Sequence, residues 1–271
     1  MKGEGKLKNK GTIILAVTLT LIVGGFVAID YDNTFLSILF APAVPNQIYS
    51  PNMPSADQKV VCIVFDDGWK SQLDALPVLQ SFGFNATFAI VTSYTSYPDY
   101  VTWKDIAKLW HSGMDIASHS VTHPDLSIVS SSQLDDELAQ IQHALRSRGY
   151  PANIFVYPYG SAASNQTVQN AVAKYYLAAR GTDVGKCNLD NCDRYNLQSY
   201  DVYHDVSMED FTGYVNGTGG NVVTILYYHK IGNQNEDTAI TLQTFQAQMQ
   251  YLKDNGYTTE TLSQLFLKTT P

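Results

Sequence analysis

The sequence predicts an α/β domain in which parallel strands alternate with helices and close, completely or incompletely, into a barrel. The main observation is that short apolar runs rich in β-branched residues alternate with longer segments of helical apolar spacing. Strands and helices that alternate at such lengths form parallel βαβ units. A second observation is that each segment with candidate chemistry directly follows a predicted strand, and chemistry in such barrels collects at the carboxyl ends of strands.

Strand-and-helix pairs follow one another from residue 59. The first strand reads Lys-Val-Val-Cys-Ile-Val-Phe, and the leucines after it lie at helical spacing. The predicted pairs are Lys59–Phe65 with Ser71–Phe82, Ala86–Val91 with Trp103–Trp110, Met114–Ala117 with Leu134–Leu145, and Ile154–Tyr157 with Thr167–Lys174. Further elements are strands at Tyr176–Ala179 and Val222–Tyr228 and a helix at Thr241–Asp254. Residues 59–271 are therefore long enough for one well-buried domain.

The first part of the chain predicts a membrane segment. Residues 11–29 carry no charge, and at about 1.5 Å rise per residue a helix of this length nearly matches a hydrocarbon core of about 30 Å. Four lysines lie within residues 1–10, and Asp30 follows the apolar run. The positive-inside bias therefore places residues 1–10 in the cytoplasm and the rest of the chain outside.

A cleaved signal peptide is the alternative to this anchor, and it would make the protein secreted. Its apolar region would usually be shorter, and the nearest small-x-small pattern, Ala41-Pro42-Ala43, lies well past the apolar run. We therefore favour a single-pass anchor. Residues 30–58 contain four prolines and no useful apolar periodicity, which predicts an extended tether.

Composition restricts the partners of the domain. A net charge of −8 and a pI near 5.1 argue against nucleic acid, because phosphate binding requires clustered lysine and arginine. A neutral or weakly charged substrate fits better, and we expect a monomer. The 18 tyrosines suit the faces of sugars, although most are expected to be structural.

Two of the three cysteines predict a disulfide. Cys187 and Cys192 are close in sequence, are flanked by polar residues, and would lie in an oxidising compartment under this topology. Cys62 lies inside an apolar strand pattern and is expected to be a buried thiol.

Asp66, Asp67 and Gly68 follow the first predicted strand. Consecutive strand residues point to opposite faces, so both carboxylates can serve one site only if the chain leaves the strand there, and Gly68 makes that turn easy. One carboxylate can then bind a metal while its neighbour stays free as a base. The alternative is a structural Asx turn or a cap for the next helix.

His119 and His123 are four residues apart and follow the strand predicted at Met114–Ala117. Pro124 biases His123 away from the α region, so we expect a strand-end loop or a single turn. Two imidazoles and Asp67 would leave an open coordination position for water, as in catalytic zinc sites. The sequence therefore predicts a metal-dependent hydrolase.

Two further strand ends carry candidate groups. His229 directly follows Val222–Tyr228 and could supply a second proton-transfer group, because imidazole titrates near neutral pH. Tyr157-Pro158-Tyr159-Gly160 ends another strand, and the backbone N–H of Tyr159 could act as an oxyanion donor. Taken alone, these segments could equally be a satisfied histidine and a strand stop.

In this order and spacing, the segments resemble the polysaccharide deacetylase family, also called carbohydrate esterase family 4 or the NodB homology domain. Phe65-Asp66-Asp67-Gly68 is similar to the family's first motif, and His119-Ser120-x-x-His123 to its second. Tyr157–Gly160 is similar to the third motif in its Pro-Tyr-Gly core, and Leu226–His229 resembles the fifth, with one extra residue relative to the usual Leu-x-His spacing. The resemblance covers about residues 59–267 and implies a distorted or incomplete (β/α) barrel of the NodB homology type.

The resemblance also implies a role for each residue of these motifs. A general base would activate water, a general acid would protonate the departing amine, and a backbone N–H would hold the oxyanion. The expected metal is zinc, with another divalent transition metal as the alternative. The implied roles are general base for Asp66, general acid for His229, oxyanion donor for Tyr159, metal ligands for Asp67, His119 and His123, acetyl-pocket lining for Leu226, and further substrate binding for Pro158 and Trp69.

The chain departs from the family pattern in two places. The third motif commonly carries an arginine that orients the base, whereas Phe155-Val156 precedes Tyr157 here and contains none. The fourth motif's aspartate, which contacts that arginine, has no clear counterpart, although Asp201 and Asp205 are candidates. Losing both together is typical of a subfamily variation, because losing only one would leave a buried charge unpaired.

We therefore predict a membrane-anchored, extracytoplasmic deacetylase that releases acetate from N-acetylated envelope or extracellular glycans. One alternative is a catalytically silent glycan-binding module that keeps the fold. Another keeps the metal hydrolase but changes the bond, for example to an O-acetyl ester or a non-sugar amide.

Overall fold

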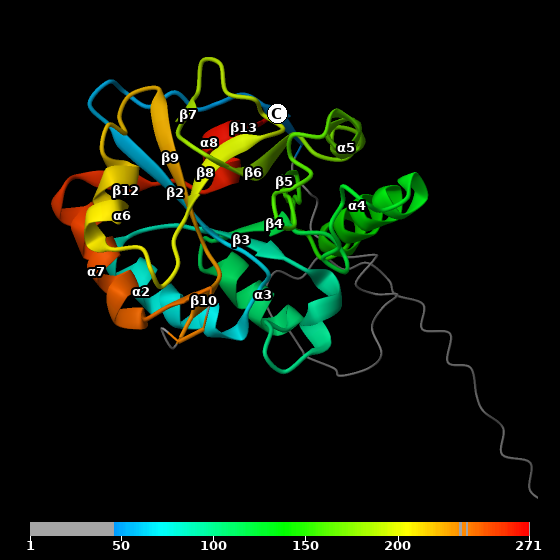
Figure 1. Ribbon diagram of the computed structural model, residues 1–271, viewed down its shortest axis with the longest axis horizontal. Helices are drawn as coiled ribbons and strands as arrows, with labels where there is room; N and C mark the ends of the chain where they lie inside the picture. The colour runs from blue at the N-terminus through cyan, green and yellow to red at the C-terminus, as the bar shows by residue number, and fades with distance from the viewer. Residues whose placement is uncertain (1–45, 233–234, 237, 271) are drawn as a thin grey trace, which may run out of the picture. The chain divides into compact units, whose positions relative to one another are not determined.

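The computed structural model describes residues 46–232, 235–236 and 238–270, and its centre is a ring of parallel strands (Figure 1). The ring closes because β2 pairs with β9 as well as with β3. Its strands, in spatial order, are β2 (Lys59–Phe65), β3 (Thr87–Ile90), β4 (Asp115–Ser118), β5 (Ile154–Val156), β6 (Ala178–Val184), β8 (Leu197–Asp201) and β9 (Val222–Tyr228). The predicted (β/α) barrel is confirmed, and its ring is closed.

Helices connect most of these strands and begin where the sequence supplies capping side chains. Thr102, Ser130 and Thr241 each accept a hydrogen bond from a backbone N–H of the first turn that follows. The helices are α2 (Ala75–Phe82), α3 (Trp103–His111), α4 (Ser131–Arg146), α5 (Gln166–Val172), α6 (Met208–Val215), α7 (Leu242–Asp254) and α8 (Leu262–Phe266), with 3-10 turns η1 (Lys70–Asp74) and η2 (Thr92–Ser96).

The first predicted helix, Ser71–Phe82, is divided into η1 and α2. Pro77 lies in the first turn of α2 and has no N–H to donate to the preceding turn, so an α-helix cannot run uninterrupted through this point. Gly83 ends α2 in the left-handed conformation, which glycine adopts without steric cost. The helix length predicted from the leucine spacing is therefore correct, but its first turn is tighter.

The barrel is irregular between β6 and β8. The chain passes through the short strand β7 (Cys187–Asn188), which pairs antiparallel with β9, and no helix covers this connection. The pairing of β6 with β8 shifts register between Arg180 and Val184. The sequence analysis predicted no strand at β8, whose Leu-Gln-Ser-Tyr-Asp sequence is mostly polar.

The folded part begins before residue 59. Strand β1 (Gln47–Tyr49) pairs antiparallel with β13 (Leu267–Thr269), and the N–H of Asn52 donates to the carbonyl of Leu265. These residues lie within 30–58, which we predicted to be a tether, so that boundary is corrected toward the amino terminus. The predicted anchor at 11–29 lies outside the described residues. Among the residues that are described, no helix is long and apolar enough to cross a membrane.

The core has parts between the strands and the surrounding helices, and another part formed by the alternate strand residues together with α8. Phe65 of β2 stacks on Phe88 of β3 at 4.9 Å between ring centroids and also contacts Phe245 of α7 at 5.7 Å. Burying one such side chain contributes about 1.5–3 kcal/mol. This packing fixes the carboxyl end of β2, where the next residues of the chain are Asp66 and Asp67.

Candidate active site

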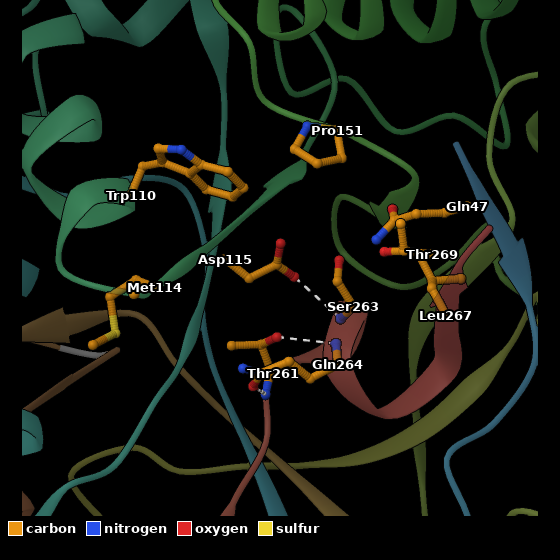
Figure 2. Close-up of a pocket in the computed structure, with 11 residues that line it drawn as sticks. Gln47, Trp110, Met114, Asp115, Pro151, Thr261, Ser263, Gln264, Leu267 and Thr269 are labelled. Carbon is orange, nitrogen blue, oxygen red and sulfur yellow. Dashed lines mark hydrogen bonds between the residues drawn. The ribbon is translucent and has the colours of Figure 1, made fainter. Parts of the chain in front are cut away.

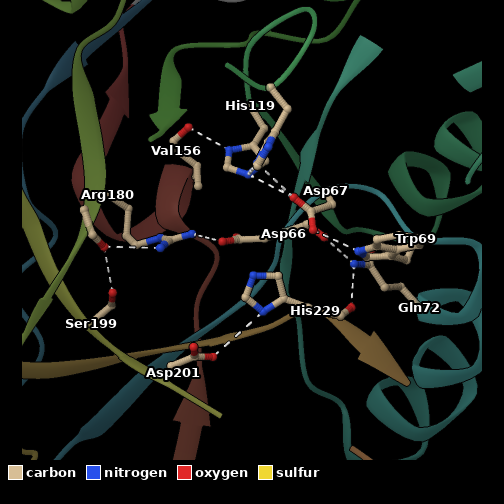
Figure 3. A network of polar contacts seen from close by, with 12 residues as sticks. Asp66, Asp67, Trp69, Gln72, His119, Val156, Arg180, Ser199, Asp201 and His229 are labelled. Carbon is tan, nitrogen blue, oxygen red and sulfur yellow. Dashed lines mark hydrogen bonds and ion pairs between the residues drawn. The ribbon is translucent and has the colours of Figure 1, made fainter. Parts of the chain in front are cut away.

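Three side chains from two strand ends form a compact cluster. Asp67 follows β2, while His119 and His123 follow β4. The Nε2 atoms of His119 and His123 lie 3.3 and 3.2 Å from Oδ1 of Asp67, and 3.2 Å from each other. The structure thus brings together the three predicted metal ligands (Figure 3 shows His119 and Asp67).

The spacing of these donor atoms fits a metal ion. Ligands at about 2.0–2.1 Å around a tetrahedral zinc ion are separated from one another by about 3.3–3.4 Å, and the three measured separations are 3.2–3.3 Å. Nδ1 of His119 lies 2.8 Å from the carbonyl oxygen of Val156, which requires a proton on Nδ1 and leaves Nε2 as the donor to a metal. These residues could therefore hold a metal with one coordination position open.

The charge state of Asp67 agrees with this role. Burial alone would raise its pKa, but the adjacent imidazoles of His119 and His123 outweigh burial and hold the pKa of Asp67 well below its usual value. The carboxylate is therefore ionised at neutral pH. Trp69 Nε1 donates a 2.8 Å hydrogen bond to Oδ2 of Asp67, which leaves Oδ1 directed at the two histidines.

Strained backbone conformations collect at this site. Asp67, Ser120, His123 and Tyr159 all have positive φ values, of 72°, 65°, 61° and 58°. Non-glycine residues rarely adopt this region, and such residues are concentrated at functional sites. The loop conformation predicted for His123 from Pro124 agrees with this geometry. The consequence is that each strand end turns sharply and directs its polar group into the same cavity.

A buried glutamate holds the histidine loop in this conformation. Oε2 of Glu137, on α4, accepts hydrogen bonds from the N–H groups of Val121 and Thr122 at 2.7 and 2.9 Å, and Oε1 accepts from the Thr122 hydroxyl. Glu137 is only 6% exposed. Sequence reasoning missed Glu137, because it lies in the middle of an amphipathic helix with nothing to distinguish it from a surface glutamate.

We expect Glu137→Ala to weaken zinc binding by about 10–100-fold, the usual effect of removing a group that orients metal ligands. Glu137→Gln should keep most of the affinity, because the amide oxygen can still accept from both N–H groups. Competition with a chelator for zinc measures the difference. Glu209→Ala, an exposed glutamate in the first turn of α6, is the matched control and should not change affinity. Equal affinity in Glu137→Ala and the control would contradict this role.

Asp66 is held differently from its neighbour. Its Oδ2 forms an ion pair with the guanidinium of Arg180, which lies on β6 and is fully buried. Its Oδ1 is buried and has no hydrogen-bond partner among the described residues. One oxygen of the carboxylate is therefore fixed by a positive charge while the other is available, and Asp66 lines the cavity that contains the metal-ligand cluster.

Arg180 corrects the sequence analysis, which found no arginine to orient the base. The third motif contains none, but the adjacent strand β6 places a guanidinium at the same carboxylate (Figure 3). The guanidinium also lies over the ring of Tyr227 at 4.4 Å. A signal was present in the sequence: Arg180 directly follows the strand predicted at Tyr176–Ala179, just as Asp66 and His229 directly follow predicted strands.

His229 lies between Asp66 and Asp201 in Figure 3 and lines the same cavity. Its Nδ1 is 3.8 Å from Oδ1 of Asp201 on β8. Burial raises the pKa of Asp201, while the nearby His229 and a hydrogen bond from Tyr227 oppose that rise. Of the two candidates for the missing aspartate, Asp201 is therefore the one at the site; Asp205 is exposed and pairs with His204.

A buried amide connects the two strands that carry Asp66 and His229. Nε2 of Gln72 donates to the backbone carbonyl of Asp66 at 2.5 Å and to that of His229 at 2.7 Å, and Gln72 is fully buried. Because β2 and β9 are also paired directly, the base and acid candidates lie on adjacent, cross-linked strand ends.

Tyr159 lies beside the metal-ligand cluster and lines the same cavity. Its ring packs on His123 at 4.6 Å, its side chain is 66% exposed, and it lines the cavity of about 370 Å³. Its backbone N–H makes no hydrogen bond to any described residue. Gly160 is required beside it, because a Cβ there would lie 1.8 Å from the Thr182 hydroxyl oxygen.

Two predicted substrate-binding residues do not line the cavity. Leu226 is fully buried in the core, and Tyr227 lines the cavity in its place. The reason is the period of two along a strand: Tyr227, two residues before His229, shares its face, whereas Leu226 does not. Pro158 is also buried away from the cavity and acts as a turn residue.

Trp69 does line the cavity, but neither face of its ring is free. Tyr100 stacks on it at 4.3 Å, and Nζ of Lys230 lies 4.2 Å from the same ring centroid. Two groups this close to one centroid must occupy opposite faces. Trp69 therefore positions Asp67 through its Nε1 and offers a sugar only the edge of its ring.

The predicted disulfide is not formed. Cys187 and Cys192 are both free thiols, although their side chains are close enough to hydrogen-bond to each other. Cys192 also contacts the hydroxyl of Tyr49, with 3.9 Å between sulfur and oxygen. The sequence spacing correctly placed the two cysteines together, and Cys62 is buried as expected.

A closed barrel with a possible Asp-His-His metal site and a separately held carboxylate is an arrangement typical of hydrolases. Residues 54–179 match the family model described as polysaccharide deacetylase. The matched segment, 126 of the 271 residues, is therefore similar to the polysaccharide deacetylase family.

Individual relatives show similar relationships over parts of the chain. A gellan lyase of Bacillus sp. is 33% identical over 144 residues, which cover 52% of this chain and 5% of that protein. The chitooligosaccharide deacetylase of Bradyrhizobium sp. (strain ANU 289) is 32% identical over 124 residues, or 44% of this chain and 53% of the relative. The chain thus spans about half the length of the second relative and a small part of the first.

Solved structures show the same fold. The Xyl-CE4 domain of a multidomain xylanase from the hindgut metagenome of Trinervitermes trinervoides superposes with a TM-score of 0.56 at 23% identity, covering 77% of this chain and 90% of that domain. The family 4 carbohydrate esterase of Streptomyces lividans gives a TM-score of 0.53 at 21% identity, with 76% and 92% covered.

Proposed function

We propose that this domain is a metal-dependent hydrolase that removes N-acetyl groups from N-acetylated amino-sugar polysaccharides and releases acetate. The observation that carries the proposal is that the two adjacent carboxylates make different contacts. Asp67 faces two imidazole donors, whereas Asp66 keeps one oxygen free beside them. The deacetylase names of several relatives support the choice of an N-acetyl group.

Asp67, His119 and His123 would hold the metal, which we propose to be zinc. A bound zinc ion would supply Lewis acidity, polarising the acetyl carbonyl and making water a stronger acid. The donor set of two neutral imidazoles and one carboxylate suits zinc, and the geometry leaves room for further ligands on the cavity side.

The other residues of the cavity would transfer protons and stabilise the negative charge that develops on the acetyl oxygen. The free Oδ1 of Asp66 accepts a proton from the attacking water, and the ion pair with Arg180 fixes the orientation of that carboxylate. The free N–H of Tyr159 donates to the oxygen that becomes negative as the acetyl carbon turns tetrahedral. His229 then donates a proton to the departing amine, and Asp201 stabilises the imidazolium form before that transfer. The C–N bond breaks, giving acetate and a free amino sugar.

The missing arginine was the main motive for considering a silent glycan-binding module. Because Arg180 supplies that charge from β6, the arrangement favours an active enzyme. We also propose that residues 11–29 anchor the chain in a membrane with the domain outside the cytoplasm; the charge pattern around that segment supports this.

The test is acetate release from N-acetylglucosamine oligomers by the purified full chain, with chelator and with zinc added back. We use the full chain because β1 precedes residue 59 and belongs to the fold. Release that chelator abolishes and zinc restores is the expected result. Parallel assays on an aryl O-acetyl ester and a non-sugar acetamide identify the bond. A folded, zinc-loaded protein that binds these oligomers but releases no acetate from any substrate would overturn the proposal.

A further inference from the structure

A second cavity lies at the opposite end of the barrel from the candidate active site. Its volume is about 350 Å³, near the lower end of the range of about 300–1,000 Å³ typical of small-ligand sites. Asp115 at the amino end of β4 lines it, whereas His119 follows the carboxyl end of the same strand. Four residues of strand span about 13 Å, so the two sites are separate.

The cavity is formed where the last elements of the chain meet the first. Gln47 of β1 and Thr269 of β13 border one side, α8 and its capping residue Thr261 another, and Trp110 at the end of α3 a third (Figure 2). Pro151, before β5, completes the wall. None of these residues has a part in the chemistry proposed above.

Asp115 is the most informative group in this cavity. It is only 6% exposed, and its Oδ2 accepts hydrogen bonds from the Ser263 N–H at 3.2 Å and the Thr87 hydroxyl at 3.3 Å. Figure 2 shows the other carboxylate oxygen directed away from Ser263, into the space between Trp110 and Pro151. Burial raises the pKa of Asp115, and hydrogen bonds from the Ser263 side chain, from the N–H groups of Ser263 and Ile116 and from the Thr87 hydroxyl only partly oppose that rise, so the carboxylate gains from another donor.

The side-chain amides of Gln47 and Gln264 provide hydrogen-bond donors, whereas Asp115 provides an acceptor. The Oε1 atom of Gln47 accepts from the side chain of Asn153 at 2.8 Å, and that of Gln264 accepts from the backbone N–H of Thr261 at 2.8 Å. Each contact fixes the orientation of the amide and leaves its NH₂ group to donate to a ligand. The cavity therefore combines one strong acceptor with two donors, beside the indole of Trp110.

This combination selects among ligand classes. A metal cation would find one carboxylate facing amide N–H groups, which is too few ligands. An anion would be repelled by Asp115, and an apolar molecule would leave its inward oxygen unpaired. A hydroxyl group both donates and accepts, so a molecule with several hydroxyls satisfies all three groups, while its C–H face packs on the indole.

We propose that this cavity binds a neutral pyranose ring, as a second glycan site separate from the catalytic one. Trp110 provides the packing surface, Asp115 accepts from ring hydroxyls, and Gln47 and Gln264 donate to them. The proposal does not depend on the deacetylase reaction, because it requires only that the ligand be a neutral sugar. Such a site would hold one part of a polymer while another part occupies the active site.

The experiment uses the full chain and two trisaccharide probes, the trimer of N-acetylglucosamine and xylotriose, with binding measured by calorimetry and saturation-transfer NMR. Xylotriose has no acetyl group, so it reports on the second site without being a deacetylase substrate. Truncating a buried aromatic anchor typically costs more than about 1–2 kcal/mol. Trp110→Ala should therefore weaken xylotriose binding by about tenfold or more, while acetate release from the short N-acetylglucosamine probe stays unchanged.

Two further variants make the result decisive. Trp103→Ala removes a tryptophan from the same helix that does not line the cavity, and it should bind xylotriose as the unmodified chain does. Thr269→Trp fills the cavity from an exposed strand position without removing a core side chain, so it tests occupancy even if Trp110→Ala fails to fold. Absence of xylotriose binding, or binding that neither Trp110→Ala nor Thr269→Trp weakens, overturns the proposal. Loss of acetate release with binding intact would instead count against the proposed function.

Discussion

Asp66→Asn is expected to lower kcat for acetate release by about 10²–10⁴-fold, the range typical of a lost general base. Zinc content should not change, because the metal-ligand cluster consists of Asp67, His119 and His123. The amide keeps the shape of the side chain but cannot take a proton from water. Steady-state kinetics together with metal analysis of the purified variant measure both effects.

Asp66→Asn should keep zinc and lose activity, whereas His119→Ala should lose both. The His119→Ala change removes one of three ligands, so zinc should be lost along with activity. Asp136→Asn, at an exposed position of α4, is the matched control for the charge change and should leave both properties as they are. If Asp66→Asn and the control turned over substrate equally fast, Asp66 would not be the base. If Asp66→Asn also lost its zinc, the separation of roles between the adjacent carboxylates would be wrong.

Arg180→Met is expected to destabilise the fold by about 3–5 kcal/mol, because removing one partner of a buried ion pair leaves the other charge uncompensated. Arg180 is fully buried, and its partner Asp66 is 3% exposed. Chemical denaturation measures the free energy of unfolding.

A double-mutant cycle separates the Asp66–Arg180 ion pair from the other contributions of Arg180 to stability. In the Asp66→Asn background, Arg180→Met should cost much less stability, since no carboxylate charge then remains to be paired. Arg194→Met removes an exposed arginine that stacks on Tyr195 at 4.8 Å, and as the control it should cost at most about 1 kcal/mol. Equal costs for Arg180→Met in both backgrounds would show that the pair contributes no coupling.

The metal ligands, which the sequence predicted, and the charged partners of Asp66 and His229, which it did not clearly predict, are arranged differently along the chain. Asp67, His119 and His123 lie in two contiguous segments after strongly apolar strands, so periodicity alone placed them at one edge of the barrel. Arg180 and Asp201 are single residues on β6 and β8, which interrupt the regular alternation of strand and helix. Nothing within either strand's own sequence relates it to Asp66 or His229; only the pairing of β6, β8 and β9 does.

The register of β9 explains why Leu226, which was predicted to line the acetyl pocket, does not line the cavity. The motif resemblance pointed to Leu226, but the extra residue before His229 reverses the side-chain alternation and turns Leu226 into the core. Tyr227 then faces the cavity, where its ring contacts the guanidinium of Arg180 and its hydroxyl bonds Asp201. Family motifs predicted which strand ends are used, whereas the exact face of each residue required the structure.

The place where the chain enters the domain determines the direction from which a polymer can reach the catalytic residues. Gln47 lies beside Asp115, at the amino ends of the barrel strands, whereas Asp66 and His229 lie beyond their carboxyl ends. The described part of the chain therefore begins on the side of the domain away from the catalytic cavity. A polymer can therefore approach the catalytic cavity without meeting the strand pair of β1 and β13.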